Sequence, residues 1–376
     1  MEEHKLQYLK SLLGQNIEVK KCVAAVEPLE AIARKCYAEP IDLSPQEFVK
    51  MMVFDGCFII QLLRKFNGEN VLDENDPIFK QDWILNSLQR DLMLLENQLP
   101  FFILCELYET LELPDKASEL IRLALNFFSD LLPVQRITHE NGNPREDISH
   151  LLDEKGNPLK DISHLLDLIH RDWSSKLEPQ QDVNRSTGEY KSIRCSTQLT
   201  EAGIKLKKID YKDIFGIQFD HGSLQIPTLV IEERTESFLR NLIAHEQYRG
   251  GDQINQINIV TDYVTFLGCL IKSEEDVTKL SHRGIICNLV GEDEVISEMV
   301  NKLIVCITGP SRNFYYAEIF RRLNIHCNRP GKRWMAKLRR NYCNSPWKII
   351  SIIVACLLLL LALLQTIFSI LSWKKQ

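Results

Sequence analysis

Two copies of Asp-Ile-Ser-His are the part of this sequence whose residue types and spacing point most directly to chemistry. Asp147 with His150, and Asp161 with His164, each place a carboxylate and an imidazole on adjacent helical turns. Both groups are ligands of first-row metals, so each pair could hold part of a metal site. No further ligand is spaced to complete such a site. We favour the interpretation that the aspartates cap helices and that the histidines were copied with them, and we expect no metal and no cofactor.

Local patterns of catalysis are missing from the sequence. It contains no nucleophile elbow, phosphate-binding loop, dinucleotide fingerprint, His-Glu-x-x-His or paired cysteine ligands. We therefore expect that the protein is not an enzyme. Distant residues can assemble a catalytic site without any local pattern, so an enzyme with a dispersed active site acting near a membrane stays the alternative.

A polar cluster lies between the apolar runs LMLL and LPFF. It comprises Asp91, Glu96, Asn97 and Gln98 and is followed by Pro100. Buried polar groups need hydrogen-bond partners. We interpret the cluster as a structural network that ties one helix to the turn at Pro100, in preference to an active site.

A second polar segment, IEERTES, follows an apolar strand pattern. Pro227 lacks an amide hydrogen and predicts an edge position or a bulge for that strand. Glu232 and Arg234 then lead into the next helix. Capping and a local ion pair explain them, and the alternative is that their charges line a groove for a partner.

Helix signals dominate the elements that must position these residues. Ser44-Pro45-Gln46-Glu47 is a capping box that opens an apolar helix ending at Asn67-Gly68. Further helices are predicted at 82–97, from Pro100, from Asp115 to Leu131, and after residue 235. The strand patterns at 214–219 and 224–231 flank a turn and predict a hairpin. The expected fold class is mainly α, as α+β with a small β-hairpin or sheet.

The expected domain organisation has five parts. These are a helical lobe at 1–135, a polar loop at 136–197, a second lobe at 198–328, a basic juxtamembrane segment at 329–348 and a transmembrane helix at 349–372. The polar loop holds a tandem duplication, in which ENGNPREDISHLLD is followed by EKGNPLKDISHLLD. A unit of this length is too short for a solenoid, so an insertion in a surface loop is the better explanation.

The C-terminal run is predicted to be one transmembrane helix. From Ile349 through Leu360 to Leu371 the sequence has no charged residue, and Trp347 and Trp373 stand at its two ends as interfacial aromatics do. Only three residues follow Trp373. Insertion would therefore occur after translation, as in single-pass, tail-anchored proteins.

Charge predicts the orientation of the chain and its partners. The basic residues Lys332, Arg333, Lys337, Arg339 and Arg340 precede the apolar run, and only two lysines follow it. The positive-inside rule then places the large N-terminal domain in the cytosol, at the plasma membrane or an endomembrane. The whole chain carries −6 and its last eleven basic residues +11, so residues 1–318 carry −17. This acidic part excludes nucleic acid as the main partner.

Several segments together resemble one plant family. They are MEEHKLQYLK at the start, DLMLLENQLPFF at 91–102, LTEAGIKLK at 199–207, LQIPTLVIEERTESFLRNLIAHEQ at 224–247, VTDYVTFLGCLIKSEEDV at 260–277 and NSPWKIIS at 344–351. In order and joint presence they are similar to the domain-of-unknown-function 247 proteins, over nearly the whole chain. The resemblance implies a plant-restricted, largely helical and C-terminally anchored protein, in a family with some members implicated in grass self-incompatibility.

The resemblance implies no particular chemistry, because the family has no established biochemical activity. Its members usually carry a further N-terminal stretch, so the chain is expected to lack that segment. The expected function is that of a membrane-tethered, non-enzymatic interaction, signalling or recognition protein. Its expected partners are the lipid bilayer and an unidentified protein. A third possibility is an assembly protein that self-associates through the membrane face of Gln365.

Overall fold

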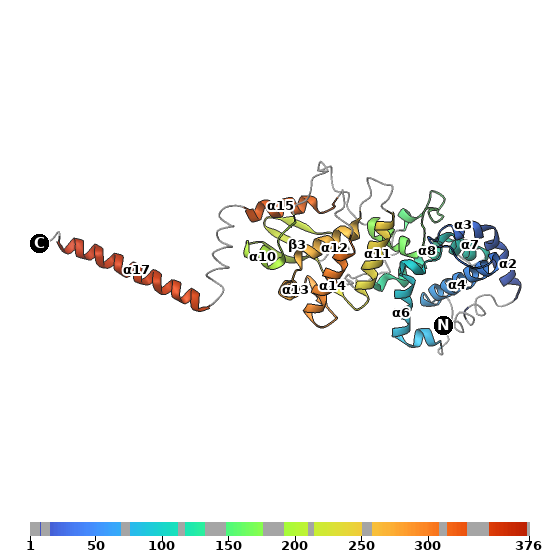
Figure 1. Cartoon of the computed structure of the whole chain (residues 1–376), viewed down its shortest axis with the longest axis horizontal. Coiled ribbons are helices and arrows are strands. Elements are labelled where there is room, and N and C mark those ends of the chain that lie inside the picture. The colour runs from blue at the N-terminus through green and yellow to red at the C-terminus, as the bar shows by residue number, and fades with distance from the viewer. Residues whose placement is uncertain are drawn as a thin grey trace.

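The computed structural model shows a mainly helical body with a separate C-terminal helix (Figure 1). The residues that the structure describes are 8, 16–68, 76–111, 117–131, 148–175, 192–209, 214–249, 258–307, 314–328 and 346–373. The mainly helical fold class with a small β component is confirmed.

The N-terminal part is a group of helices around one long buried helix. That helix is α4 (Pro45–Phe66), which packs against α2 (Asn16–Val26), α7 (Phe101–Thr110) and α8 (Ala117–Phe127). The group also contains η1 (Glu27–Leu29), α3 (Glu30–Arg34), α5 (Pro77–Lys80), α6 (Asp82–Leu92), η2 (Leu95–Asn97) and η3 (Ser129–Leu131). Most of the apolar side chains of α4 are buried, as its sequence predicts.

The start of α4 confirms the predicted capping box. The Ser44 hydroxyl accepts a hydrogen bond from the Glu47 amide, and the Glu47 carboxylate accepts one from the Ser44 amide at 3.0 Å. Pro45 occupies the first helical position, where no amide donor is needed. The predicted helix at 82–97 is shorter than expected, because α6 ends at Leu92 and a 3₁₀ turn follows it.

The duplicated segment is more than a surface loop. Its first copy forms η4 (Ser149–Leu151), and its second copy runs into α9 (Leu165–Ser175). Equivalent side chains of the two copies are buried, Ile148 with Ile162 and Leu151 with Leu165. The structure thus differs from the polar loop expected at 136–197, because apolar residues of both copies reach the core.

The β component is two small sheets. One has the order β1-β3-β2, in which β1 (Lys205–Ile209) runs parallel to β3 (Ser223–Pro227) and β2 (Gln218–Asp220) runs antiparallel to it. The other pairs β4 (Leu229–Ile231) with β5 (Ile286–Asn288) in parallel. The predicted hairpin is present as β2 and β3.

The edge position predicted from Pro227 is wrong, because β3 is the central strand of its sheet. Pro227 is nevertheless tolerated there. It pairs only with Ile209 of β1, since the pairing with β2 covers 223–225 and ends before residue 227. Its missing amide therefore leaves no gap between two neighbouring strands.

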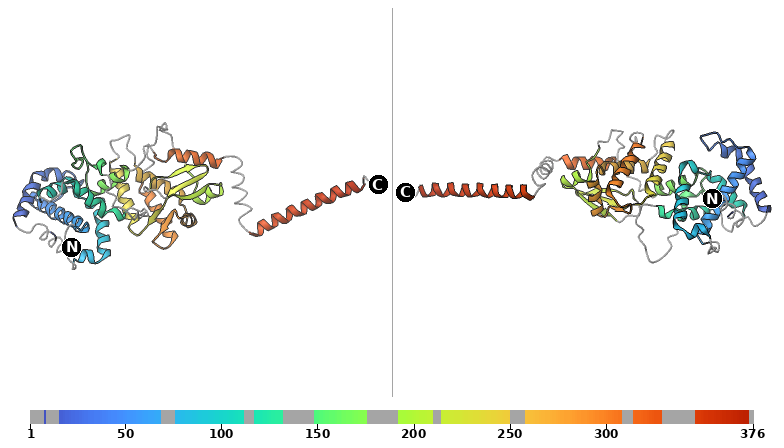
Figure 2. Two further views of the ribbon diagram at one scale, coloured as in Figure 1. Left: turned by 180° about the vertical axis from the view of Figure 1, so that it is seen from behind. Right: turned by 60° about the horizontal axis from the view of Figure 1, so that its bottom comes forward.

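The C-terminal part of the body is a second group of helices. It contains α10 (Ser196–Glu201), α11 (Thr235–Arg249), α12 (Ile259–Leu270), α13 (Glu274–His282), α14 (Asp293–Val305) and α15 (Ala317–Asn328). Helix α11 joins the two groups, because it packs against α9 and η2 on one side and against α12 and α14 on the other (Figures 1 and 2).

Helices α12 and α14 approach closely at Gly268. A Cβ atom added there would lie 2.5 Å from both Cγ1 and Cδ1 of Ile304. The β-branched side chain of Ile304 has little freedom to move away. We expect Gly268→Ala to destabilise the fold by about 1–3 kcal/mol from overpacking, partly offset by roughly 1 kcal/mol of helix propensity.

Thermal unfolding would measure this effect, and Ile304→Ala supplies the control. In the Ile304→Ala background, Gly268→Ala is expected to be harmless or stabilising, because the obstructing atoms are gone. Equal losses in both backgrounds would contradict the close packing.

The C-terminal helix is α17 (Pro346–Trp373), which lies apart from the body in all three views (Figures 1 and 2). Side chains described from 350 to 367 are exposed, among them Leu360 at 57% and Leu359 at 66%. Within the described residues, no helix combines the length and hydropathy needed to cross a membrane. The transmembrane part of the predicted fold is therefore not confirmed.

Candidate functional site

Four buried polar side chains meet between α9 and α11. They are Asp167 and His170 of α9, with His245 and Glu246 of α11, and their exposed fractions are 0%, 4%, 2% and 1%. We call these residues the α9–α11 cluster. Asp167 and His170 share one face of α9 because they are three residues apart. Acidic and histidine side chains are rarely fully buried without hydrogen-bond partners, so the cluster is described by the partners of each of its side chains.

Asp167 is the centre of the cluster's hydrogen bonds. Its Oδ1 accepts from Arg249 Nη1 at 2.7 Å and from His245 Nε2 at 3.2 Å. Its Oδ2 accepts from the Ser163 amide at 2.8 Å, and Arg171 Nε lies 3.1 Å from both oxygens. Burial alone would raise the pKa of Asp167. The hydrogen bonds from His245 and Ser163 and the two guanidinium groups outweigh burial and hold this pKa well below its usual range.

Glu246 connects the cluster to α12. His170 Nε2 lies 2.8 Å from Glu246 Oε1. The same carboxylate accepts from the amides of Val260 and Thr261 at 3.0 and 2.8 Å, and from the Thr261 hydroxyl at 2.6 Å. A carboxylate at a helix N-terminus is favoured by the free amides and by the helix dipole. Glu246 therefore caps α12 and holds His170 at the same time.

A third imidazole, that of His164, borders the cluster. Its Nδ1 accepts a hydrogen bond from the Asp167 amide at 3.1 Å, and its ring centroid lies 5.1 Å from that of His245. Burial, together with the neighbouring His245, lowers the pKa of His164 to about 4. Burial also lowers the pKa of His245, against the opposing effect of Asp167. Both rings are therefore neutral at pH 7.

Two imidazole nitrogens of the cluster make no hydrogen bond within the described part of the chain. Nδ1 of His170 and Nδ1 of His245 are buried, and neither has a hydrogen-bond partner in the described part of the chain. The two rings are neighbours, with centroids 5.4 Å apart. Two imidazoles and a carboxylate are a metal-binding set of groups. Because the cluster is so deeply buried, a large substrate has no access to it.

The described residues of the two Asp-Ile-Ser-His copies lie at separate places and have different partners. Asp147 lies outside the described residues, and His150 Nε2 lies 3.4 Å from Asp172 Oδ1. The Asp161 carboxylate accepts from Arg171 Nη1 at 2.8 Å, so it forms an ion pair with Arg171. Among the three of these residues that the structure describes, His164 alone contacts the α9–α11 cluster.

The polar cluster at 91–98 depends on Gln98. Gln98 Nε2 donates to the carbonyl oxygens of Leu92 and Leu94 at 2.7 Å each, and its Oε1 accepts from the Leu166 amide at 3.1 Å. Asn97 Nδ2 donates to the Asp91 carbonyl at 3.0 Å. These contacts connect the end of α6 and the start of α9.

The other members of this segment take no part in the α9–α11 cluster. Glu96 and Asn97 are exposed, and Asp91 faces Arg90 at 3.5 Å. Pro100 is buried directly before α7, where the Phe101 amide donates to the Ser163 carbonyl at 2.8 Å. The segment is thus joined to the second repeat copy through its backbone.

Arg234 connects two parts of the body. Its Nε donates to Glu232 Oε2 at 2.9 Å, which is the local ion pair expected from the sequence. Its Nη1 also donates to Gln89 Oε1 at 2.9 Å and Asn86 Oδ1 at 3.1 Å, both on α6. Arg234 therefore holds the start of α11 against the N-terminal helices.

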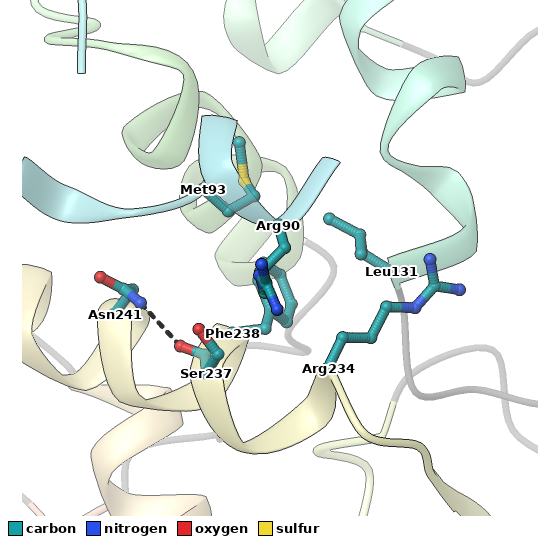
Figure 3. Close-up of a pocket in the computed structure, with 7 residues that line it drawn as sticks. All are labelled: Arg90, Met93, Leu131, Arg234, Ser237, Phe238 and Asn241. Carbon is teal, nitrogen blue, oxygen red and sulfur yellow. Dashed lines mark hydrogen bonds between the residues drawn. The ribbon is translucent and has the colours of Figure 1, made fainter. Parts of the chain in front are cut away.

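A pocket beside Arg234 is the hollow drawn in Figure 3. Its empty space of about 190 Å³ includes open solvent, and it is lined by Arg90, Met93, Leu131, Arg234, Ser237, Phe238 and Asn241. Asn241 Nδ2 donates to the Ser237 carbonyl, and the guanidinium of Arg234 points away from both residues (Figure 3). The hollow is therefore a shallow surface depression and does not form an enclosed site of the roughly 300–1,000 Å³ that small molecules occupy.

No pattern in the sequence predicts the α9–α11 cluster. His170 and His245 are separated by 75 positions, and no periodicity predicts that α9 and α11 pack together. The usable signals were local: Asp167 and His170 at a helical spacing, and the consecutive His245-Glu246 inside an otherwise amphipathic helix. The juxtamembrane residues Lys332, Arg333, Lys337, Arg339 and Arg340 lie outside the described residues. The side chains of Trp347, Ile349, Leu371 and Trp373 do as well.

Comparison with known proteins gives a family and no activity. The model of DUF247, a plant protein family of unknown function, matches residues 1–361. UPF0481 protein At3g47200 of Arabidopsis thaliana is 30% identical over 384 residues, which cover 99% of this chain and 79% of the relative. Putative UPF0481 protein At3g02645 of the same plant is 23% identical over 453 residues, covering 97% and 82%. No solved structure matches the chain.

Proposed function

Because the chain belongs to the DUF247 family of plant proteins of unknown function, we propose its role from its geometry. The protein is a non-enzymatic interaction protein, held at a membrane by α17, whose helical body binds a protein partner in the cytosol. The single observation that carries the proposal is the exposure of the apolar side chains of α17, which lies apart from the body.

The sequence of the apolar run from Ile349 to Leu371, which extends beyond the side chains that the structure describes, supports a bilayer as its environment. The helix has 28 residues, which at about 1.5 Å per residue gives roughly 42 Å, against about 30 Å for the hydrocarbon core of a bilayer. From Ile349 to Leu371 it contains no charged residue. Leaving such a surface in water is costly, at roughly 25 cal/mol for each Å² of apolar area.

The body supports an interaction role more than catalysis. The side chains of the α9–α11 cluster are each at most 4% exposed. The hollow in Figure 3 is a shallow depression that would not enclose an ordinary substrate. The cytosolic orientation rests on the basic residues that precede α17 in the sequence.

Membrane attachment is tested by alkaline extraction of the full-length chain expressed in plant cells. We expect the wild type to stay in the membrane pellet after a carbonate wash. Leu358→Arg with Leu361→Arg is expected to release it, because each arginine at the centre of a membrane helix costs about 2.5–3.5 kcal/mol. Val305→Arg with Ile325→Arg is the matched control, since both positions are exposed on the body. Recovery of the wild type in the supernatant would contradict tethering.

Orientation and partner binding need separate measurements on the wild type and the same variants. In sealed vesicles, added protease should digest the body if it faces the cytosol. Proximity labelling should give a set of neighbouring proteins that the Leu358→Arg, Leu361→Arg variant loses. Identical neighbours for both proteins would show that the tether does not select the partner.

A further inference from the structure

We propose that the solvent-facing side of the β1-β3-β2 sheet binds the anionic headgroups of the membrane to which α17 is proposed to attach. The proposal rests on that membrane attachment and adds to it the side of the body that lies on the membrane. We call this side of the sheet the basic sheet face. Its charged residues are Lys205 and Lys207 of β1 and Asp220 of β2, with Arg322 of α15 at its edge.

The strand register places these side chains on one side of the sheet. Lys205 pairs with Ser223 and Ser223 pairs with Asp220, so the three side chains project from the same side. Lys207 is two residues from Lys205 along β1 and therefore projects from that side as well. Lys205, Lys207 and Asp220 are exposed. The other side of the sheet faces the core and buries Leu206, Phe219, Leu224 and Ile226.

The charges of the basic sheet face are positive in sum. Arg322 Nη2 lies 3.4 Å from Asp220 Oδ1, so the one carboxylate that the described strands place on this side is offset by a guanidinium group. Within the described part of the chain, no acid forms an ion pair with Lys205 or Lys207. Both lysines therefore add their charges to the surface without a described counter-ion.

Two further basic residues extend this charge around the outer edge of β1. Lys208 and Arg283 are exposed, and Cδ of Lys208 lies 3.5 Å from the position that a Cβ atom would take at Gly284, next to Arg283. The acids of the neighbouring helices α15 and α10 change the sum little. Glu318 pairs with Arg321, and Glu201 is half-buried.

The remainder of the body carries the opposite charge. Residues 1–318 sum to −17 although they include the lysines of β1. An anionic leaflet therefore attracts the basic sheet face and repels the acidic surface elsewhere. This asymmetry turns the body so that the basic sheet face points toward the headgroups.

The basic sheet face lies at the end of the body that is nearest to α17. Strand β3 and helix α15 are at that end in Figure 1, and the left view of Figure 2 shows the same arrangement. Helix α15 ends at Asn328 and α17 begins at Pro346, a separation of 18 positions that spans at most about 60–65 Å. A tethered body therefore meets the lipid surface at a high effective concentration, at which a few basic residues are enough for binding.

The size of the basic sheet face suits a charged surface better than a single bound group. Its outer strands are two strand spacings apart, about 10 Å, which is close to the Debye length of about 8 Å at physiological ionic strength. The charges of β1 and α15 therefore act on the same patch of headgroups. Each basic residue near an anionic leaflet strengthens binding by about fivefold.

The test uses the full-length protein in vesicles of phosphatidylcholine alone and in vesicles with about 30% phosphatidylserine. A neutral acetylating reagent modifies exposed lysines, and peptide mass spectrometry gives the rate at Lys207. Lys302, whose side chain is 60% exposed on α14, is the internal reference. We expect Lys207 to react at least about fivefold more slowly in the anionic vesicles, and this difference to disappear in about 0.5 M salt.

A pair of charge variants tests whether the basic sheet face causes this protection. Lys205→Gln with Arg322→Gln removes two charges from the face and keeps Lys207 as the reporter, so the rates in the two kinds of vesicle should become equal. Lys50→Gln with Arg240→Gln is the matched control, since it removes two exposed charges from α4 and α11, and it should keep the wild-type difference. The wild-type comparison stands even where a variant fails to fold.

Flotation of the same vesicles separates this proposal from the membrane tether. A chain that floats with both kinds of vesicle while Lys207 reacts equally in both overturns the proposal and leaves the tether in place. A chain that floats only with the anionic vesicles supports the basic sheet face and contradicts insertion of α17. Flotation with neither kind overturns both. Slow acetylation of Lys207 in both lipids, relieved by diluting the protein, would assign the face to the acidic surface of a second copy and also overturns the proposal.

Discussion

Asp167→Asn is expected to lower the free energy of unfolding by about 3 kcal/mol. The wild-type carboxylate accepts hydrogen bonds from Arg171, Arg249, His245 and the Ser163 amide. Without that charge, Arg249 loses its ion pair with residue 167 and Arg171 keeps only the exposed Asp161. The NH2 group of the new asparagine also faces hydrogen-bond donors. Removing one partner of a buried ion pair costs about 3–5 kcal/mol. We take the lower value because Arg171 and Arg249 are 19% and 29% exposed.

Urea unfolding would measure this loss. Asp161→Asn is the matched control, because Asp161 pairs with the same Arg171 but is 68% exposed. It should cost less than about 1 kcal/mol. Equal losses for the two variants would mean that the α9–α11 cluster contributes no more than a surface ion pair.

Asp167→Asn should also change how the free energy of unfolding depends on pH. The pKa of Asp167 is held below its ordinary value in the fold, so its contribution is present above the ordinary pKa of about 3.9. That contribution is lost as the pH falls below this value and approaches the lowered pKa of the folded state. The difference in the free energy of unfolding between the wild type and Asp167→Asn should therefore disappear as the pH falls from about 4 to about 2.

Asp262→Asn is expected to stabilise the protein at alkaline pH. Asp262 lies on α12 and is 1% exposed. Its Oδ2 accepts from the Tyr315 amide at 2.7 Å, and its Oδ1 has no partner among the described residues. Burial raises the pKa of Asp262 to about 8, and the nearby Glu246 adds to this against the effect of the Tyr315 hydrogen bond. The folded protein therefore keeps this carboxyl group protonated at pH 7.

The direction of the pH effect follows from the raised pKa. Protonated Asp262 stabilises the fold fully below the ordinary pKa of about 3.9, and this stabilisation is lost as the pH rises toward 8. The loss of stabilisation is at most about 6 kcal/mol, at roughly 1.4 kcal/mol for each pKa unit. Asparagine resembles the protonated acid and has no proton to lose.

Denaturation curves at pH 4.5 and pH 8.5 would show the effect of Asp262→Asn. The variant should match the wild type at the lower pH and exceed it by several kcal/mol at the higher pH. Glu298→Gln, on the exposed face of α14, should give no such difference. A wild type that is equally stable at both pH values, with a variant that tracks it, would contradict the raised pKa.

The sequence predicted the elements whose signals are local. The capping box at Ser44, the proline before α7 and the turn between β2 and β3 all occur where their residues indicate. Each of these signals acts within a few residues, so no tertiary contact is needed to read it.

The sequence did not predict features that depend on contacts between distant segments. Strand β1 contains Lys-Leu-Lys-Lys-Ile, and its parallel partner β3 begins well after it along the chain. Pro227 indicated an edge strand, because the sequence does not show that β2 ends before it. The partners of Asp167 come from α11, for which no pattern in α9 is informative.

The two copies of the duplicated segment show how this chain can change its length. Asp153 in the first copy accepts hydrogen bonds from the amides of Lys155 and Asn157 in an exposed turn, and Asp167 is its equivalent in the second copy. One carboxylate closes a turn and the other organises the interior, although the two sequences around them are nearly the same. Each copy carries its own isoleucine and leucine for the core, so an added unit needs no new hydrophobic site elsewhere. When the chain lengthens by a whole copy of this segment, the sequence of one copy can diverge while the other copy keeps α9 in position.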